Sequence, residues 1–95
     1  MRHILEKETL TLYLEGELNS ANAEEVEKEI DSLTKNNTFS NLVIDMEKLR
    51  YMSSAGIRII IRTKQQNDSL KIVNVPKDVH DIFEMVGLLG LLDIR

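Results

Sequence analysis

The feature that most limits what this chain can fold into is a short apolar run that leads through a charged stretch to a pair of serines. The run Leu42-Val43-Ile44 shows no polar alternation, which is typical of a strand covered on both faces within a parallel or mixed sheet. Asp45 marks its carboxyl end, and Ser53 and Ser54 follow. Functional groups of open α/β sheets gather beyond the carboxyl ends of strands, where loops turn into helices. We therefore expect the serine pair in that crevice.

Ser53 and Ser54 also suit the beginning of a helix. A serine hydroxyl accepts a hydrogen bond from one of the backbone N–H groups that the first helical turn leaves without a partner. A phosphate there would meet the positive end of the helix dipole. It would add about −1.5 to −2 charges and three acceptor oxygens, so it would change the surface and leave the fold intact. The simpler interpretation of the same serines is a helix cap without modification.

The segment from Ser54 to Gln66 can be interpreted in two ways. Its isoleucines alternate at 57, 59 and 61, so periodicity alone permits a strand. As a helix, which we favour, Ser54, Arg58 and Arg62 share one face because they are spaced four residues apart. Arg58 could then reach back toward a phosphate on Ser54. The alternative for both arginines is an ordinary solvated helix face.

Length and composition exclude several classes of protein. With 95 residues we expect a single domain spanning 1–95, because a chain of this size supports one modest core. A formal net charge of −4 disfavours nucleic acid and anionic membranes as partners, since both require a basic surface. The absence of cysteine excludes disulfides and thiolate chemistry. The N-terminal residues are too charged for a signal peptide and no apolar run has membrane-spanning length, so we predict a cytoplasmic protein without direct membrane insertion.

Periodic patterns predict further elements before the central run. Leu10, Leu12 and Leu14 alternate with polar residues, as in a strand with one buried face, and residues 16–20 end this strand. The helix that follows has acidic residues in its first turn and stops at Asn36-Asn37. Its apolar positions are Ala23, Val26, Ile30 and Leu33.

The C-terminal part predicts a strand, a helix and an apolar tail. Pro76 suits the first position of the helix, and Gly87 suits its C-terminal cap. The tail 88–94 is apolar enough for a last short strand or helix, and an exposed part of it could support a weak homodimer. The strand residues are Leu70, Ile72, Val73 and Val75, and the buried stripe of the helix is expected to consist of Val79, Ile82, Phe83 and Val86.

Three segments together resemble the STAS domains, named for sulfate transporters and anti-sigma factor antagonists. They are Gly16-Glu17-Leu18-Asn19, the segment from Asp45 to Gly56, and Phe83-Glu84-Met85-Val86-Gly87-Leu88. The middle segment is the most specific, because the family pattern there is Met, Asp, Ser, Ser, Gly or a close variant, with the serine after the Asp as phosphoacceptor. The resemblance implies an α/β fold with a small mixed sheet of about four to five strands and helices mainly on one side. It also settles the isoleucine-rich segment as a helix.

The resemblance implies a role in partner switching as a bacterial anti-sigma factor antagonist. In that family an anti-sigma factor serine kinase binds the unphosphorylated antagonist and releases its sigma factor, and a PP2C-type phosphatase reverses the phosphorylation. Alignment with the family pattern places the phosphoacceptor on Ser54, with Ser53 as the less favoured choice. The chain would be a substrate and a switch, with no catalytic residue, cofactor or metal of its own. The expected partner-binding residues are Asn19, Ser20, Ser53, Ser54, Ala55, Gly56, Arg58 and Arg62.

Other interpretations remain beside this one. The sequence contains no nucleophile elbow, no glycine-rich phosphate loop and no cluster of metal ligands, so we do not expect an enzyme. His3 and His80 have no ligand-spaced partner and are expected to be ordinary residues. Asp45 is either a strand-end residue bonded to the next loop or a direct member of the site. The main alternative function is a constitutive STAS subunit of a lipid-trafficking ABC-type membrane transport complex, in which the serine would be a contact residue only.

Overall fold

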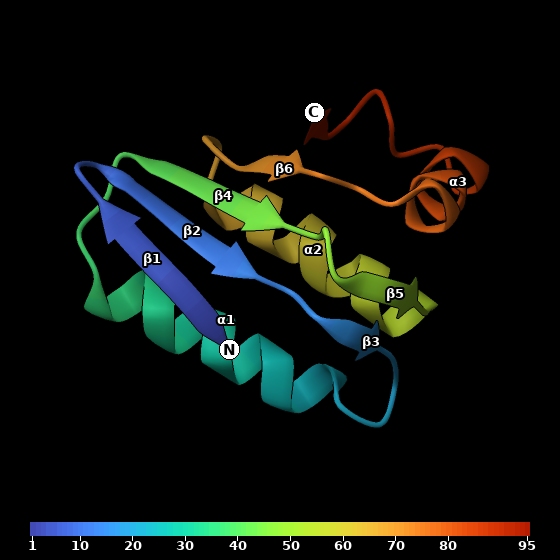
Figure 1. Ribbon diagram of the computed structural model, residues 1–95, viewed down its shortest axis with the longest axis horizontal. Helices are drawn as coiled ribbons and strands as arrows, with labels where there is room; N and C mark the ends of the chain where they lie inside the picture. The colour runs from blue at the N-terminus through green and yellow to red at the C-terminus, as the bar shows by residue number, and fades with distance from the viewer.

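The computed structural model describes residues 1–95 and contains a mixed sheet, a second small sheet and three helices (Figure 1). The strands are Arg2–Glu6 (β1), Thr9–Tyr13 (β2), Gly16–Leu18 (β3), Asn41–Asp45 (β4), Leu49–Met52 (β5), Lys71–Val73 (β6) and Asp93–Ile94 (β7). The helices are Ala23–Asn36 (α1), Ser54–Gln66 (α2) and Lys77–Met85 (α3). The α/β class and the mixed sheet that the sequence predicts are confirmed.

The larger sheet has the strand order β1-β2-β4-β6-β7. β1 and β2 form an antiparallel hairpin, and each of the other neighbouring pairs is parallel. Its central pair, β2 and β4, aligns Leu10 with Leu42 and Leu12 with Ile44, and all four side chains are fully buried. These three leucines and Ile44 therefore form the centre of the core, on the face of the large sheet that α1 and α2 cover (Figure 1).

The structure corrects the expectation that residues 16–20 only end the strand before them. Gly16–Leu18 forms β3, which pairs in parallel with β5 as a separate sheet of two strands. Gly16 has a φ of +79°, a conformation that favours glycine, and its N–H donates to Lys48 O over 2.9 Å. The chain thus bends at Gly16 and continues as a new strand rather than as a turn.

Most ends of the other elements agree with the sequence patterns, but β6 is shorter than expected and Val86, expected on the buried stripe of the last helix, lies after α3 and is 49% exposed. α1 stops at the predicted asparagines, and α2 is a helix over the whole of the ambiguous segment. Pro76 lies one position earlier than expected, at the N-cap of α3. Gly87 has a φ of +75° and donates to Glu84 O, while Leu88 N donates to Phe83 O, which is the Schellman ending of a helix. The apolar tail supplies β7, and none of the helices has the length and apolar character needed to span a bilayer.

Candidate functional site

The serine pair lies where β5 passes into α2. Within β5, Leu49 and Met52 are buried and anchor the strand in the core. Ser53 N then donates to Leu18 O over 2.9 Å, which ties the residue before the helix to β3. Ser54 is the first residue of α2 and its side chain is exposed. The structure therefore brings the serines to a helix start, as the sequence predicts.

The two serines differ in what their hydroxyl groups can reach. Ser53 is the N-cap residue, with the extended backbone typical of that position, but its side chain makes no capping hydrogen bond. Its Oγ is buried and has no hydrogen-bond partner. Ser54 presents the accessible hydroxyl, and the N–H groups of the first turn of α2 receive no side-chain cap. A modifying enzyme would thus reach Ser54 more easily than Ser53.

Gly56 holds the start of α2 against the small sheet. A Cβ at this position would lie 2.7 Å from Met52 Cγ and 2.8 Å from Leu18 Cγ, much closer than side-chain carbons tolerate. Only glycine lets the first turn of the helix approach β3 and β5 this closely. Gly56 belongs to the expected partner-binding residues, but it is buried. Its contribution to the site is therefore to position the neighbouring residues.

A hollow of about 360 Å³ lies between the beginning of α1 and the beginning of α2. It brings together three residues of the expected partner-binding set, Ser20, Ala55 and Arg58, and Ser54 immediately precedes Ala55. The remaining lining residues are Ala23, Glu24, Glu27 and Ile59. The sequence patterns did not predict this hollow, because it depends on how α1 and α2 are placed relative to one another.

The loop before α1 is fixed by its asparagines. Asn19 Oδ1 accepts a hydrogen bond from Ala21 N, and Asn19 N donates to Asn22 Oδ1, each over 2.9 Å. Asn22 Nδ2 also donates to Glu17 O over 2.7 Å. Asn19 therefore shapes the loop that carries Ser20 to the hollow.

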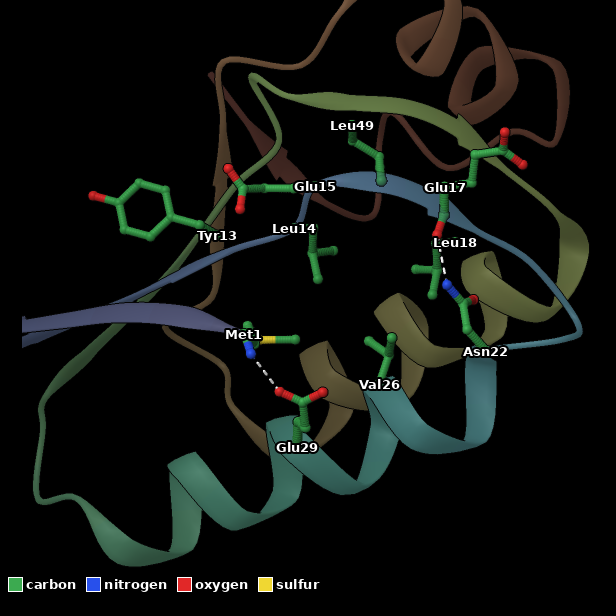
Figure 2. A pocket seen from close by; sticks show the side chains of 10 residues that line it. All are labelled: Met1, Tyr13, Leu14, Glu15, Glu17, Leu18, Asn22, Val26, Glu29 and Leu49. Carbon is green, nitrogen blue, oxygen red and sulfur yellow. Dashed lines mark hydrogen bonds and ion pairs between the residues drawn. The ribbon is translucent and has the colours of Figure 1, made fainter.

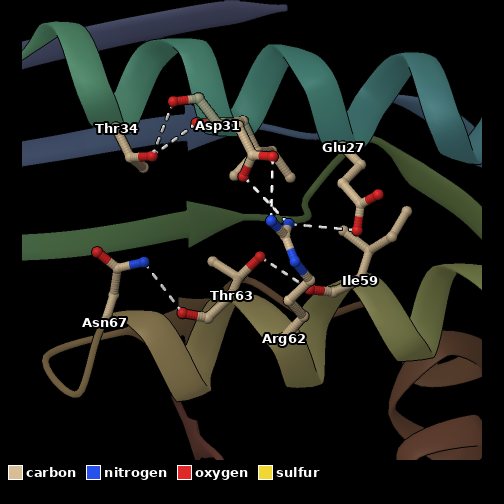
Figure 3. A network of polar contacts seen from close by, with 8 residues as sticks. Glu27, Asp31, Thr34, Ile59, Arg62, Thr63 and Asn67 are labelled. Atoms are coloured by element: carbon tan, nitrogen blue, oxygen red, sulfur yellow. Dashed lines mark hydrogen bonds and ion pairs between the residues drawn. The ribbon is translucent and has the colours of Figure 1, made fainter.

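The two arginines of α2 have different surroundings. Arg62 points toward α1 and forms hydrogen bonds to Asp31 and Glu27, as Figure 3 shows. The hydrogen bond to Asp31 raises the pKa of the Arg62 guanidinium, and the charges of both carboxylates add to the effect. Arg58 is exposed and forms no ion pair. Of the two, Arg58 is the cation available to a phosphate or a partner beside Ser54.

Asp45 makes the loop contacts expected of a strand-end residue. Its Oδ1 accepts a hydrogen bond from Glu47 N, and its Oδ2 accepts one from Asn74 Nδ2, each over 2.9 Å. The carboxylate thus joins the loops after β4 and β6. His3 is exposed and His80 half-buried, and neither lines the hollow between α1 and α2.

A separate cavity of about 220 Å³ lies between the β2–β3 junction and α1 (Figure 2). Glu15, Glu17 and Glu29 line it together with apolar side chains, and the Met1 amino group lies 2.6 Å from Glu29 Oε2. None of the expected site residues lines this cavity. The hollow between α1 and α2 is therefore the better candidate for the functional surface.

The sequence matches the STAS domain over residues 4–95. The chain belongs to the STAS domain family. Among its relatives is BtrV of Bordetella bronchiseptica, whose name assigns it provisionally to the anti-sigma factor antagonists. BtrV is 31% identical over 85 residues, which span 85% of this chain and 72% of BtrV.

Solved structures of the same fold include further anti-sigma factor antagonists. One from Mycobacterium paratuberculosis superposes with a TM-score of 0.88 at 16% identity, covering 99% of this chain and 82% of that chain. Unphosphorylated SpoIIAA superposes with a TM-score of 0.79 at 17% identity, covering 99% and 86% of the two chains. The phosphorylated form of SpoIIAA from Bacillus gives 0.67 at 19% identity, covering 99% and 91%. These superpositions support the fold assignment of this STAS domain.

Proposed function

We propose that this STAS domain is an anti-sigma factor antagonist whose choice of partner is controlled by phosphorylation of Ser54. The observation that carries the proposal is the exposed Ser54 hydroxyl at the first position of α2, beside first-turn N–H groups that no side chain caps. The similarity to BtrV, a relative named as an anti-sigma factor antagonist, supports this functional class. A phosphorylated form of SpoIIAA, which shares the fold, gives a precedent for modification.

In the unmodified state, the surface around Ser54 and the hollow between α1 and α2 would bind an anti-sigma factor serine kinase, which then releases its sigma factor. The kinase transfers the γ-phosphoryl group of ATP to Ser54 Oγ, which loses its proton, and ADP leaves. A PP2C-type phosphatase hydrolyses the ester, returning the hydroxyl and releasing inorganic phosphate. This STAS domain serves as the substrate in both steps and requires no cofactor.

The phosphate would act through charge at a docking surface. It adds about −1.5 to −2 charges at a place where partner binding removes water. Binding would then have to strip water from a dianion or overcome repulsion by like charges on the partner. A coupling of about 1–3 kcal/mol changes partner affinity roughly 5- to 150-fold, which is enough to exchange one partner for another. Arg58 follows Ser54 by one helical turn, so its guanidinium can pair with the phosphate and withdraw from the partner.

Affinity purification from the native cell tests this function. Ser54→Ala should retain a kinase of the anti-sigma type, and Ser54→Asp should lose it. Ser32→Asp is the matched control, because Ser32 is an exposed serine on a different helix, α1. The negative charge introduced there should leave the kinase bound. Equal recovery of the kinase by Ser54→Ala and Ser54→Asp would rule out the switch. Recovery of a permease or ATPase subunit in its place would support the constitutive transport subunit instead.

A further inference from the structure

β1 leaves one edge of the large sheet open. It pairs only with β2, because it is the first strand in the order β1-β2-β4-β6-β7. All five of its residues are exposed, including Ile4 at 39% and Leu5 at 42%. An edge strand with free backbone groups and exposed apolar side chains is a template for pairing with another strand.

The hairpin geometry determines which backbone groups of β1 face outward. Glu6 and Thr9 flank the two-residue turn, so they form a hydrogen-bonded pair, and such pairs alternate with non-hydrogen-bonded ones along an antiparallel ladder. His3 and Leu5 therefore direct their N–H and C=O groups away from β2. These are the groups that a further strand would bind.

The side chains of β1 alternate between the two faces of the sheet. His3 and Leu5 lie opposite Leu12 and Leu10, whose side chains point into the core. The other three residues therefore project from the face that α1 and α2 leave uncovered. On that face the Arg2 guanidinium lies 4.0 Å from the centre of the Tyr13 ring. The uncovered face of β1 thus carries a cation, an apolar side chain and an anion, in the order Arg2, Ile4, Glu6.

We propose that β1 pairs with β1 of a second copy of this chain, in antiparallel orientation and centred on Ile4. In this register each Ile4 faces the Ile4 of the second copy, and each Arg2 faces a Glu6. The hydrogen-bonded positions are His3 and Leu5, the two residues whose backbone groups face outward. The strand is thus complementary to itself, as a two-fold interface requires.

Other registers lose this complementarity. A slip of two residues in one direction places Arg2 opposite Ile4, and a slip in the other direction places Glu6 opposite Ile4. Each slip removes both Arg2–Glu6 pairs, and cross-strand pairs of opposite charge contribute roughly 0.2–1 kcal/mol each. The charges at the ends of β1 therefore select one pairing.

The proposed dimer leaves the serine surface accessible. β1 is the outer strand of the large sheet, whereas Ser54 follows β5, which belongs to the small sheet (Figure 1). Two Ser54 surfaces would then be presented on one dimer. The proposal does not depend on the phosphorylation of Ser54.

Charge reversal tests the interface. Sedimentation at increasing concentration should show the mass rising from 10.9 kDa toward twice that value. Arg2→Glu and Glu6→Arg should each raise the dimer dissociation constant about tenfold or more, because each places like charges opposite one another. The double variant Arg2→Glu with Glu6→Arg should restore the parent value. A monomer at every soluble concentration, or a dimer whose dissociation constant is indifferent to these charges, would overturn the proposal.

Cysteine crosslinking tests the register, because the chain has no cysteine of its own. Ile4 would form a non-hydrogen-bonded pair with its own copy, at a Cα separation of about 4.5 Å that a disulfide can bridge. Under mild oxidation Ile4→Cys should form a covalent dimer, and the matched control His3→Cys should not, since His3 faces Leu5. Crosslinking of His3→Cys as fast as that of Ile4→Cys would contradict the register.

Discussion

Arg62 of α2 donates two hydrogen bonds to the Asp31 carboxylate of α1, from Nη1 over 3.1 Å and from Nη2 over 3.2 Å. The same Nη1 also lies 3.2 Å from Glu27 Oε2. This arrangement joins the two helices that cover one face of the large sheet (Figure 3). The start of α2 packs on β3 and β5 through Gly56, so the helix that carries Ser54 is fixed at two places.

Replacement of Arg62 should loosen the contact between α1 and α2. Arg62→Ala leaves Asp31 and Glu27 close together without their shared cation, so we expect a lower melting temperature in thermal unfolding followed by circular dichroism. Arg58→Ala is the matched control, because it removes an arginine side chain one turn earlier in α2. Arg58 forms no ion pair, so this variant should leave the melting temperature unchanged. Equal melting temperatures for the two variants would contradict this role of Arg62.

Gly56→Ala should destabilise the protein although alanine is the better helix former. The new Cβ must displace Met52 or Leu18, and overpacking of this kind costs about 1–3 kcal/mol against a gain of about 0.8–1 kcal/mol in helix propensity. We therefore expect a net loss of about 1 kcal/mol in the free energy of unfolding, measured by urea denaturation. Gly90→Ala is the control, because nothing lies within 4 Å of the position of its Cβ. A Gly56→Ala variant at least as stable as Gly90→Ala would show that the close approach is unimportant.

Arg58→Glu should weaken kinase binding if the hollow is the docking surface. Arg58 lines the hollow and has no carboxylate partner within the chain, so its reversal changes the charge that a partner meets. We expect a roughly fivefold to tenfold loss of affinity in a calorimetric titration with the copurified kinase. Lys35→Glu, an exposed reversal in the last turn of α1, should leave the affinity unchanged. Equal affinities for the two reversals would remove this face of α2 from the interface.

Ser54→Asp should leave the fold intact. The side chain is exposed and stands at the positive end of α2, where a negative charge is favourable by about 0.3–1 kcal/mol. Its melting temperature should equal or slightly exceed that of the parent. Gln66→Asp places the same charge at the opposite end of the same helix and should lower the melting temperature. A Ser54→Asp variant that unfolds more readily than Gln66→Asp would contradict this view of the helix start.

The sequence predicted those elements whose burial follows a regular period. Apolar and polar residues alternate along β2, and apolar residues recur at helical spacing along α1. The helix start at Ser54 follows from the family pattern. β1 was not predicted, because all its side chains are exposed and it is held by backbone pairing with β2. The sequence pattern only ends a strand at residues 16–20, because Gly16–Leu18 becomes a strand through its pairing with β5.

Within the candidate site, the sequence predicted the position of Ser54 but not the difference between the arginines. Both arginines share one helix face by spacing, and only the packing of α1 beside α2 brings Asp31 and Glu27 to Arg62. The close approach at Gly56 likewise depends on Leu18, a residue of another strand. The ion pairs of Arg62 and the close approach at Gly56 both depend on contacts between segments that are distant in the sequence. A local sequence pattern does not contain such contacts.

Mass spectrometry of the tryptic peptide from Tyr51 to Arg58 is the most direct test of the proposed function. The peptide should be recovered from the native cell in growing and in stressed cultures, with fragmentation that separates Ser53 from Ser54. The phosphoswitch predicts phosphate on Ser54 whose occupancy changes between the two conditions. A peptide that is well detected and unmodified in both, or that carries phosphate on Ser53 alone, would contradict it.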